Sequence, residues 1–342
     1  MLAQRAPDVQ LHRDERHSGV AGGGQENMEQ AVRLDQLSRR FGRFTAVDRM
    51  SFGVRQGEVV GFLGPNGAGK STTMRMLAGF LTPTSGHAWI MGHDVEARPL
   101  EARRAIGYLP EGAPLYGDMT PLALLRFVAS MRGMGTAETR ENIATAIERT
   151  DLAEVAYKPI ETLSKGFKRR VGLAAAILHD PPVLILDEPT DGLDPNQKHE
   201  VRALIADMAA DKAIIVSTHI LEEVTAICTR AIVIARGKLI ADATPAQFQA
   251  YSEWHDAVAL RLLPQQIETA VEALSDIPSI YEVKRMNHAA DGHDLLVVPI
   301  QGERIASTVA DRLLEAGVEI QDFRVETGRL DDVFRKLTTT QH

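Results

Sequence analysis

Short apolar runs, each bounded by glycine, proline or polar residues, recur along the first two thirds of the chain and predict buried β-strands. The strand candidates are residues 31–37, 46–54, 58–63, 183–186 and 213–216, with a hairpin over 230–240 that turns at Arg236-Gly237. Apolar residues at helical spacing predict a helix over 70–81, followed by a turn at 82–86, and a helix-rich segment from about 116 to 178. A further turn is expected at Arg43-Phe44. Strands that alternate with helices favour an α/β fold.

The pattern changes after about residue 249. Strands are expected at 257–262, 281–286, 294–300 and 319–325, and helices at 264–274, 305–316 and 330–337. The order β-α-β-β-α-β with a last helix predicts a small ferredoxin-like α+β domain. Residues 1–28 are polar and contain a run of three glycines, so they are expected to form a disordered extension. The expected division is therefore 1–28, 29–248 and 249–342.

Composition narrows the classes of function. The 342 residues carry a net charge of −8, which does not indicate a nucleic-acid partner. The single cysteine, Cys228, excludes a disulfide framework within the chain and lies in an apolar stretch, so it is expected to be an inert core thiol. No apolar run reaches the ~18–20 residues that a membrane-spanning helix needs, so a second protein would have to supply any membrane anchor.

The most specific motif is Gly-Pro-Asn-Gly-Ala-Gly-Lys-Ser at residues 64–71, which matches the phosphate-loop pattern in full. It follows an apolar strand and opens a helix, as that motif requires. Glycines let the backbone approach phosphate oxygens, amides at the helix start point at them, Lys70 reaches the β- and γ-phosphates, and the Ser71 hydroxyl is a Mg²⁺ ligand. The predicted nucleotide-binding residues are Asn66, Gly67, Ala68, Gly69, Lys70, Ser71 and Thr72.

A second motif ends the apolar strand at 183–186 with two acids, Asp187 and Glu188. Ligands bind at the carboxyl ends of strands in α/β sheets. One acid in this position can hold Mg²⁺ and the other can activate an attacking water. The pattern therefore predicts Asp187 as a metal ligand and Glu188 as a catalytic base.

These two motifs, and the residues between and after them, resemble the ATP-binding-cassette (ABC) family over about residues 31–245. Leu-Ser-Lys-Gly-Phe at 163–167 is similar to the family signature loop, placed before a helix expected over about 168–178. The resemblance implies that Ser164 and Gly166 bind the γ-phosphate held by a second cassette. Asp191, in Asp-Gly-Leu-Asp-Pro, lies where the family has its D-loop, a turn that contacts the dimer partner.

Three further positions take their roles from the same resemblance. His219 follows the strand at 213–216 and corresponds to the family's switch histidine, which touches the γ-phosphate. Phe41 corresponds to the aromatic residue that stacks on adenine, with Phe44 as a rival. Glu111 stands where the family has a glutamine that senses the γ-phosphate, and a carboxylate there could serve as a metal ligand while adding negative charge. The signature loop also departs from the commonest form at Lys165 and Phe167.

The resemblance implies a P-loop NTPase fold, with a RecA-like core, an antiparallel β subdomain and a helical subdomain at about 115–178. It implies an ATPase that uses ATP and Mg²⁺, dimerises with a second cassette and drives a separate membrane permease from the cytoplasmic face of the membrane. The end of the chain is similar to ATPase subunits of bacterial drug-, polysaccharide- and gliding-motility-type exporters. The alternatives are a cassette ATPase of translation or DNA repair, and a regulatory subunit that binds ATP without turnover.

Overall fold

The computed structural model describes residues 30–112, 114–287, 292–300 and 302–339. This part of the chain forms two compact units, one ending at Thr244 and the other beginning at Pro245, and each is described separately. The expected extension at 1–28 lies outside the described residues. The expected boundary after residue 248 falls inside helix α8 (Pro245–Ala250), which belongs to the second unit.

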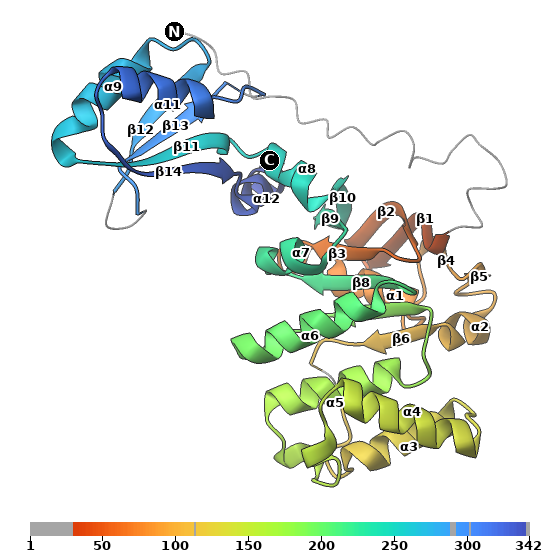
Figure 1. Cartoon of the computed structure of the whole chain (residues 1–342). Helices are drawn as coiled ribbons and strands as arrows, with labels where there is room; N and C mark the ends of the chain where they lie inside the picture. Colours follow the sequence, from red (N-terminus) through yellow and green to blue (C-terminus); the bar gives the residue numbers. More distant parts are fainter. Residues whose placement is uncertain (1–29, 113, 288–291, 301, 340–342) are drawn as a thin grey trace. The chain divides into compact units, whose positions relative to one another are not determined.

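A six-stranded sheet forms the centre of the first unit (Figure 1). Its strand order is β10-β9-β3-β8-β7-β6, and all neighbours are parallel except the β9–β10 hairpin. Their bounds are β3 Val59–Leu63, β6 Ile106–Leu109, β7 Val183–Asp187, β8 Ala213–Thr218, β9 Arg230–Ala235 and β10 Lys238–Ala243. Strands β3, β7 and β8 are buried along their whole length, which explains their continuous apolar runs. The sequence pattern did not predict β6.

A smaller antiparallel sheet, in the order β2-β1-β4-β5, packs on the other side of helix α1 (Lys70–Leu77). Its strands are β1 Gln30–Phe41, β2 Phe44–Arg55, β4 Ser85–Ile90 and β5 His93–Asp94. One hydrophobic core joins both sheets and α1, with Met74, Met76 and Leu77 of the helix at 0–1% exposure. The helix ends four residues earlier than expected, and the expected turn at 82–86 ends in β4, because Ser85 pairs with β1.

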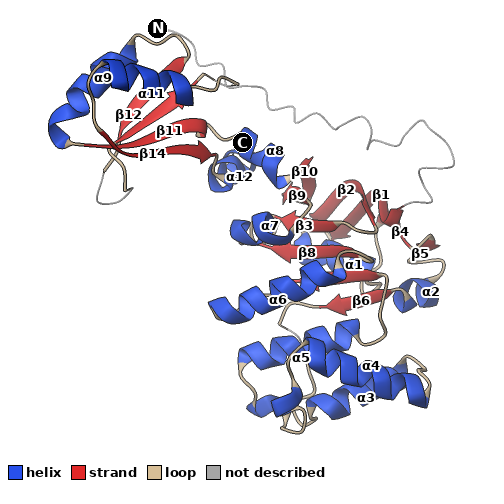
Figure 2. Cartoon of the chain, in the orientation of Figure 1, coloured by secondary structure: helices blue, strands red, loops and turns tan. Residues whose placement is uncertain are grey.

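The remaining helices of the first unit cover the sheet and build a helical region (Figure 2). Helices α3 (Pro121–Met131), α4 (Thr136–Arg149) and α5 (Lys165–Ile177) contact one another, and α5 also packs against β6. Helices α2 (Pro99–Arg104), α6 (Pro195–Met208) and α7 (Leu221–Ile227) complete the unit. Helix α5 begins three residues before its expected start, because the Ser164 hydroxyl accepts a hydrogen bond from the Phe167 amide and caps it.

The second unit contains an antiparallel sheet in the order β12-β13-β11-β14. Its elements follow one another as β11 (His255–Leu262), α9 (Ile267–Ser275), β12 (Ile280–Arg285), β13 (Leu295–Pro299), α11 (Ala306–Glu315) and β14 (Ile320–Thr327). The pairing of the first strand with the third and fourth is the ferredoxin-like arrangement that the sequence predicted. Helix α12 (Leu330–Thr339) follows and contacts α8.

Two expectations from composition bear on the described residues. None of their helices combines the length and apolar character required to cross a membrane. Cys228 is buried, and this burial raises the pKa of its thiol to about 12. The thiol is therefore protonated at neutral pH, in agreement with an inert core position.

Candidate functional site

The loop at residues 64–69 has the geometry of a phosphate-binding loop. It joins the end of β3 to the start of α1, and Gly69 is the residue that precedes the helix. Gly67 and Gly69 have φ angles of 80° and 107°, a region that other residues rarely adopt. No side chain caps the first turn of α1, so the amides there remain available to an anionic ligand.

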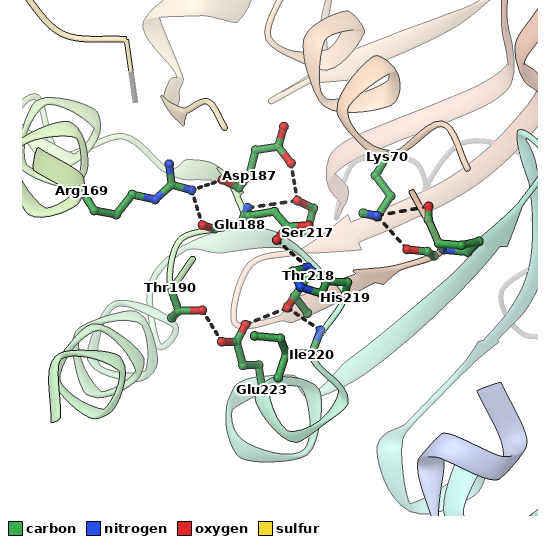
Figure 3. Close-up of polar contacts among 12 residues, drawn as sticks. Lys70, Arg169, Asp187, Glu188, Thr190, Ser217, Thr218, His219, Ile220 and Glu223 are labelled. Atoms are coloured by element: carbon green, nitrogen blue, oxygen red, sulfur yellow. Dashed lines mark hydrogen bonds and ion pairs between the residues drawn. The ribbon is translucent and has the colours of Figure 1, made fainter. Parts of the chain in front are cut away.

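Lys70 turns back over this loop. Its Nζ donates to the carbonyl oxygen of Gly64 at 2.7 Å and to that of Pro65 at 3.4 Å, as Figure 3 shows. Burial lowers the pKa of Lys70, while the negative charges of Glu188, Asp187 and Glu111 act in the opposite direction. The structure therefore places the predicted phosphate-binding cation in the field of all three predicted acids.

Asp187, the last residue of β7, has one carboxylate oxygen that accepts a hydrogen bond and one that has no partner among the described residues. The Ser217 hydroxyl of β8 donates to Oδ1, whereas Oδ2 is buried and has no hydrogen-bond partner among the described residues (Figure 3). A buried carboxylate oxygen without a partner is costly, and a cation would satisfy it. Mg²⁺ is a cation that suits such a site, because it takes one or two protein carboxylates and fills its shell with phosphates and waters.

Glu188 and His219 face each other across the ends of β7 and β8. His219 Nδ1 lies 2.6 Å from a Glu188 carboxylate oxygen. Burial raises the pKa of Glu188, and the His219 and Lys70 charges oppose that shift. Glu188 also has a φ of 52°, a left-handed conformation that costs on the order of 1–3 kcal/mol in a residue other than glycine. Its carboxyl group is therefore held by both its side-chain partner and an unusual backbone.

Two buried groups that support these loops were not predicted from the sequence. Glu223 of α7 accepts hydrogen bonds from the hydroxyls of Thr190 and Thr218, and so links the loop after β7 to the end of β8 (Figure 3). Arg169 of α5 donates to main-chain carbonyls at the end of β7. No short sequence signal identifies either one, because their partners are brought together only by the fold.

The predicted dimer-contact residues form a second group. Ser164 and Gly166 lie at the start of α5, and Gly166 packs against the side chain of Gln197 at the start of α6. Asp191 is exposed in the turn that leads to Asp194, the cap of α6. The signature-like loop and the D-loop-like turn of one chain are therefore neighbours. Within the described chain, Ser164 and Lys70 form no hydrogen bond with each other.

The remaining candidates outside the phosphate loop, Phe41, Phe44 and Glu111, are exposed. Phe41 is the last residue of β1, beyond the strand expected at 31–37, and the Arg39 guanidinium lies 4.7 Å from the centre of its ring. Phe41 is 46% and Phe44 62% exposed, so both rings remain partly accessible, although Arg39 covers one face of Phe41. Glu111 is exposed just beyond β6, where its charge acts on Lys70. Phe41 and Phe44 are therefore both candidates to stack on adenine.

Known sequences similar to this chain come from one family. The sequence profile described as "ABC transporter" matches residues 47–191. The chain is 39% identical to an Escherichia coli protein named "Probable multidrug ABC transporter ATP-binding protein YbhF" over 66% of its own length, but spans only 39% of that protein. It is 39% identical to the Nod factor export ATP-binding protein I of Paraburkholderia xenovorans, over 64% of this chain and 72% of the relative.

A longer match involves the daunorubicin resistance ATP-binding protein DrrA2 of Streptomyces coeruleorubidus. It is 33% identical over 320 residues and covers 90% of this chain and 95% of the relative, so the similarity extends into the second unit. Among solved structures, an ATP-binding subunit of an ABC transporter matches with a TM-score of 0.60 at 30% identity, over 64% of this chain and 92% of that one. A dimeric bacterial ABC transporter cassette matches in fold, with a TM-score of 0.58 at 22% identity over 63% of this chain and 98% of the other.

Proposed function

The chain belongs to the ATP-binding proteins of the ABC transporter family, and on that premise we propose that it binds and hydrolyses ATP to drive a separate membrane permease. The observation that carries the proposal is the convergence of four side chains at the ends of adjacent strands. Lys70 follows β3, Asp187 and Glu188 end β7, and His219 follows β8 (Figure 3). A cation, a carboxylate with a free oxygen, a candidate base and its histidine partner are the groups that phosphoryl transfer to water requires.

The roles of the residues follow from these positions. The loop amides and Lys70 bind the β- and γ-phosphates and offset charge that develops as the γ-phosphate leaves. Glu188, with its raised pKa, accepts the proton of the attacking water, and His219 fixes the orientation of that carboxylate through the 2.6 Å contact. Ser71, the free oxygen of Asp187 and Glu111 are the candidates to hold Mg²⁺, which supplies Lewis-acid charge stabilisation when bound.

Ser164, Gly166 and Asp191 complete the proposal as a surface for a second cassette. They lie on neighbouring turns at the starts of α5 and α6, and the relative with a matching fold is a dimer. The amides at the start of α5 suit an anion, as those of α1 do. We infer that this surface contacts the γ-phosphate bound by the partner cassette, so that hydrolysis loosens the dimer and switches the permease.

A variant at Ser164 tests the composite site. In the Glu188→Gln background, ATP is expected to convert the chain to a dimer, and adding Ser164→Arg is expected to prevent the dimer by placing a bulky side chain at the anion site. Size-exclusion chromatography with light scattering measures the dimer, and equilibrium titration checks that the monomer still binds ATP. Ser130→Arg, at an exposed position of α3, is the control and should still dimerise. Equal dimer formation by both variants would contradict the composite site.

A pair of variants decides which aromatic residue stacks on adenine. Phe41→Ala is expected to weaken ATP binding about tenfold, because base–aromatic stacking contributes about 1–3 kcal/mol. Phe44→Ala is expected to leave binding within about twofold and serves as the matched control, since both side chains are exposed. Comparing the affinities for ATP and for inorganic triphosphate gives the contribution of the adenine to binding. A larger loss in Phe44→Ala would reverse the assignment.

The permease is proposed on the family relationship and on the names of the relatives, which include export and drug-resistance proteins. Mild detergent extraction of membranes, followed by purification through a tag on this chain, is expected to recover a multi-spanning protein. We propose that the chain binds this protein at the inner face of the membrane. Exclusive recovery of a nucleic-acid complex would instead favour the translation or repair alternative.

A further inference from the structure

Arg169, on helix α5, is buried among the backbones of two different loops. Its Nη1 donates to the Pro110 carbonyl after β6 at 3.0 Å, and its Nε donates to the Pro189 carbonyl at 3.3 Å. Its Nη2 donates to the carbonyls of Asp187 and Glu188, as Figure 3 shows. The side chain of one helix therefore fixes the chain just before Glu111 and on both sides of the candidate base.

These contacts differ from an ordinary buried ion pair. Arg169 is 6% exposed, yet within the described chain the hydrogen bonds of its guanidinium all go to main-chain carbonyls. Burial lowers the pKa of Arg169, whereas the charges of Asp187, Asp191, Glu188 and Glu111 act in the opposite direction without touching it. Only a planar fork with several donors can reach carbonyls on two loops at once.

The contacts coincide with the most unusual backbone of the site. Glu188 has a left-handed φ of 52°, and such a conformation persists only where the surroundings impose it. The Glu188 amide is held on one side by the Ser217 carbonyl at 3.1 Å, and its carbonyl is held on the other by Arg169. With the backbone fixed on both sides, the side chain is directed to His219.

Arg169 also lies on the helix that the signature-like loop begins. Ser164 caps α5, and Arg169 follows within the same helix, so the start of α5 and the Glu188 loop are joined by one side chain. A shift of this helix would therefore move the main chain of the candidate base, Glu188. No contact of Glu188 with Ser164 itself is needed for this connection.

We propose that Arg169 is a positioning residue that holds Glu188 in its productive conformation from the signature helix. It acts through the main chain around Glu188, to whose carbonyls its guanidinium donates. The proposal rests on the proposed ATPase function. To that function it adds a residue that influences the turnover rate. Loss of Arg169 should therefore lower kcat while ATP binding persists.

The conservative variant Arg169→Lys keeps the charge but removes the fork. It is expected to lower kcat by about 10- to 100-fold, the size of effect that small misplacement of a reacting group produces, with the KM for ATP changed by less than about threefold. Arg170→Lys is the matched control: Arg170 is the next residue of α5, is similarly buried, and pairs with Asp151 and Glu200 instead of the Glu188 loop. Its kcat should remain within about threefold of the wild type.

A double-mutant cycle separates positioning from general support of the fold. In the Glu188→Gln background, Arg169→Lys should change the residual rate by less than about threefold, because the group it positions is already lost. Equal losses in both backgrounds, a kcat equal to that of Arg170→Lys, or a chain that fails to fold while Arg170→Lys folds would each overturn the proposal. Absence of hydrolysis by the wild-type chain would refute the proposed function instead, so the two failures are distinguishable.

Discussion

Glu188→Gln is expected to lower ATP hydrolysis by about 100- to 10,000-fold while ATP binding is retained. The amide keeps the size of the side chain and can still bond with His219, but it cannot accept a proton from water. Glu188 is also the carboxyl group of the site whose pKa is raised by burial, which brings its basicity closer to that of a base working at neutral pH. Steady-state release of phosphate measures the loss, and equilibrium titration measures binding.

The matched control for this change is Glu222→Gln. Glu222 is exposed on α7, so the same replacement removes one negative charge without altering the strand ends. Its rate should remain within about twofold of the wild type. A Glu188→Gln chain that hydrolyses ATP as fast as this control would refute the assignment of the base, whereas accumulation of an ATP-bound dimer would support it.

The phosphate loop could be predicted from the sequence because its function resides in consecutive residues. Glycines with positive φ, the helix start and Lys70 all lie within residues 64–71, so local chemistry determines the geometry. The acids at the end of β7 were predictable for a related reason. The end of a buried apolar strand can be recognised where polar residues begin. Asp187 and Glu188 are the first two polar residues after the apolar run of β7.

The supporting contacts could not be predicted in this way. Lys168, Arg169 and Arg170 are consecutive basic residues, a type that is mostly exposed in proteins. The last two are nevertheless buried, because the fold supplies carbonyls to one and acids to the other. Likewise, the pairing of Glu223 with Thr190 joins residues 33 positions apart. Such partners become visible only after the strands have been placed side by side.

The missed strands have a similar explanation. Strand β4 begins at Ser85 and Gly86, residue types that favour turns, and pairing with β1 overrides that local preference. Strand β6 has four residues, includes Gly107 and precedes a proline, so its own propensity is weak. Its place at the edge of the parallel sheet comes from pairing with β7, and that position brings Glu111 to the site.

Asp187→Asn is expected to lower hydrolysis by about 100-fold or more at low Mg²⁺ concentration, because it neutralises the buried oxygen that has no protein partner. The change should leave the fold intact, since an asparagine can still accept the hydrogen bond that Ser217 donates. Raising the Mg²⁺ concentration should recover part of the rate if the defect lies in metal affinity. Titration of the rate with Mg²⁺ at fixed ATP measures this directly.

Asp207→Asn provides the control for the charge change. Asp207 is exposed at the far end of α6 and pairs with Arg149 at 2.6 Å, so its loss removes an acid of the same type away from the strand ends. A surface ion pair of this kind contributes about 0–1 kcal/mol to stability, too little to affect turnover. If both variants had the same Mg²⁺ dependence, Asp187 could not be a metal ligand, and the orphan oxygen would need a different partner. If only Asp187→Asn needs a higher Mg²⁺ concentration to reach its half-maximal rate, the cation binds at the end of β7, beside the catalytic base Glu188.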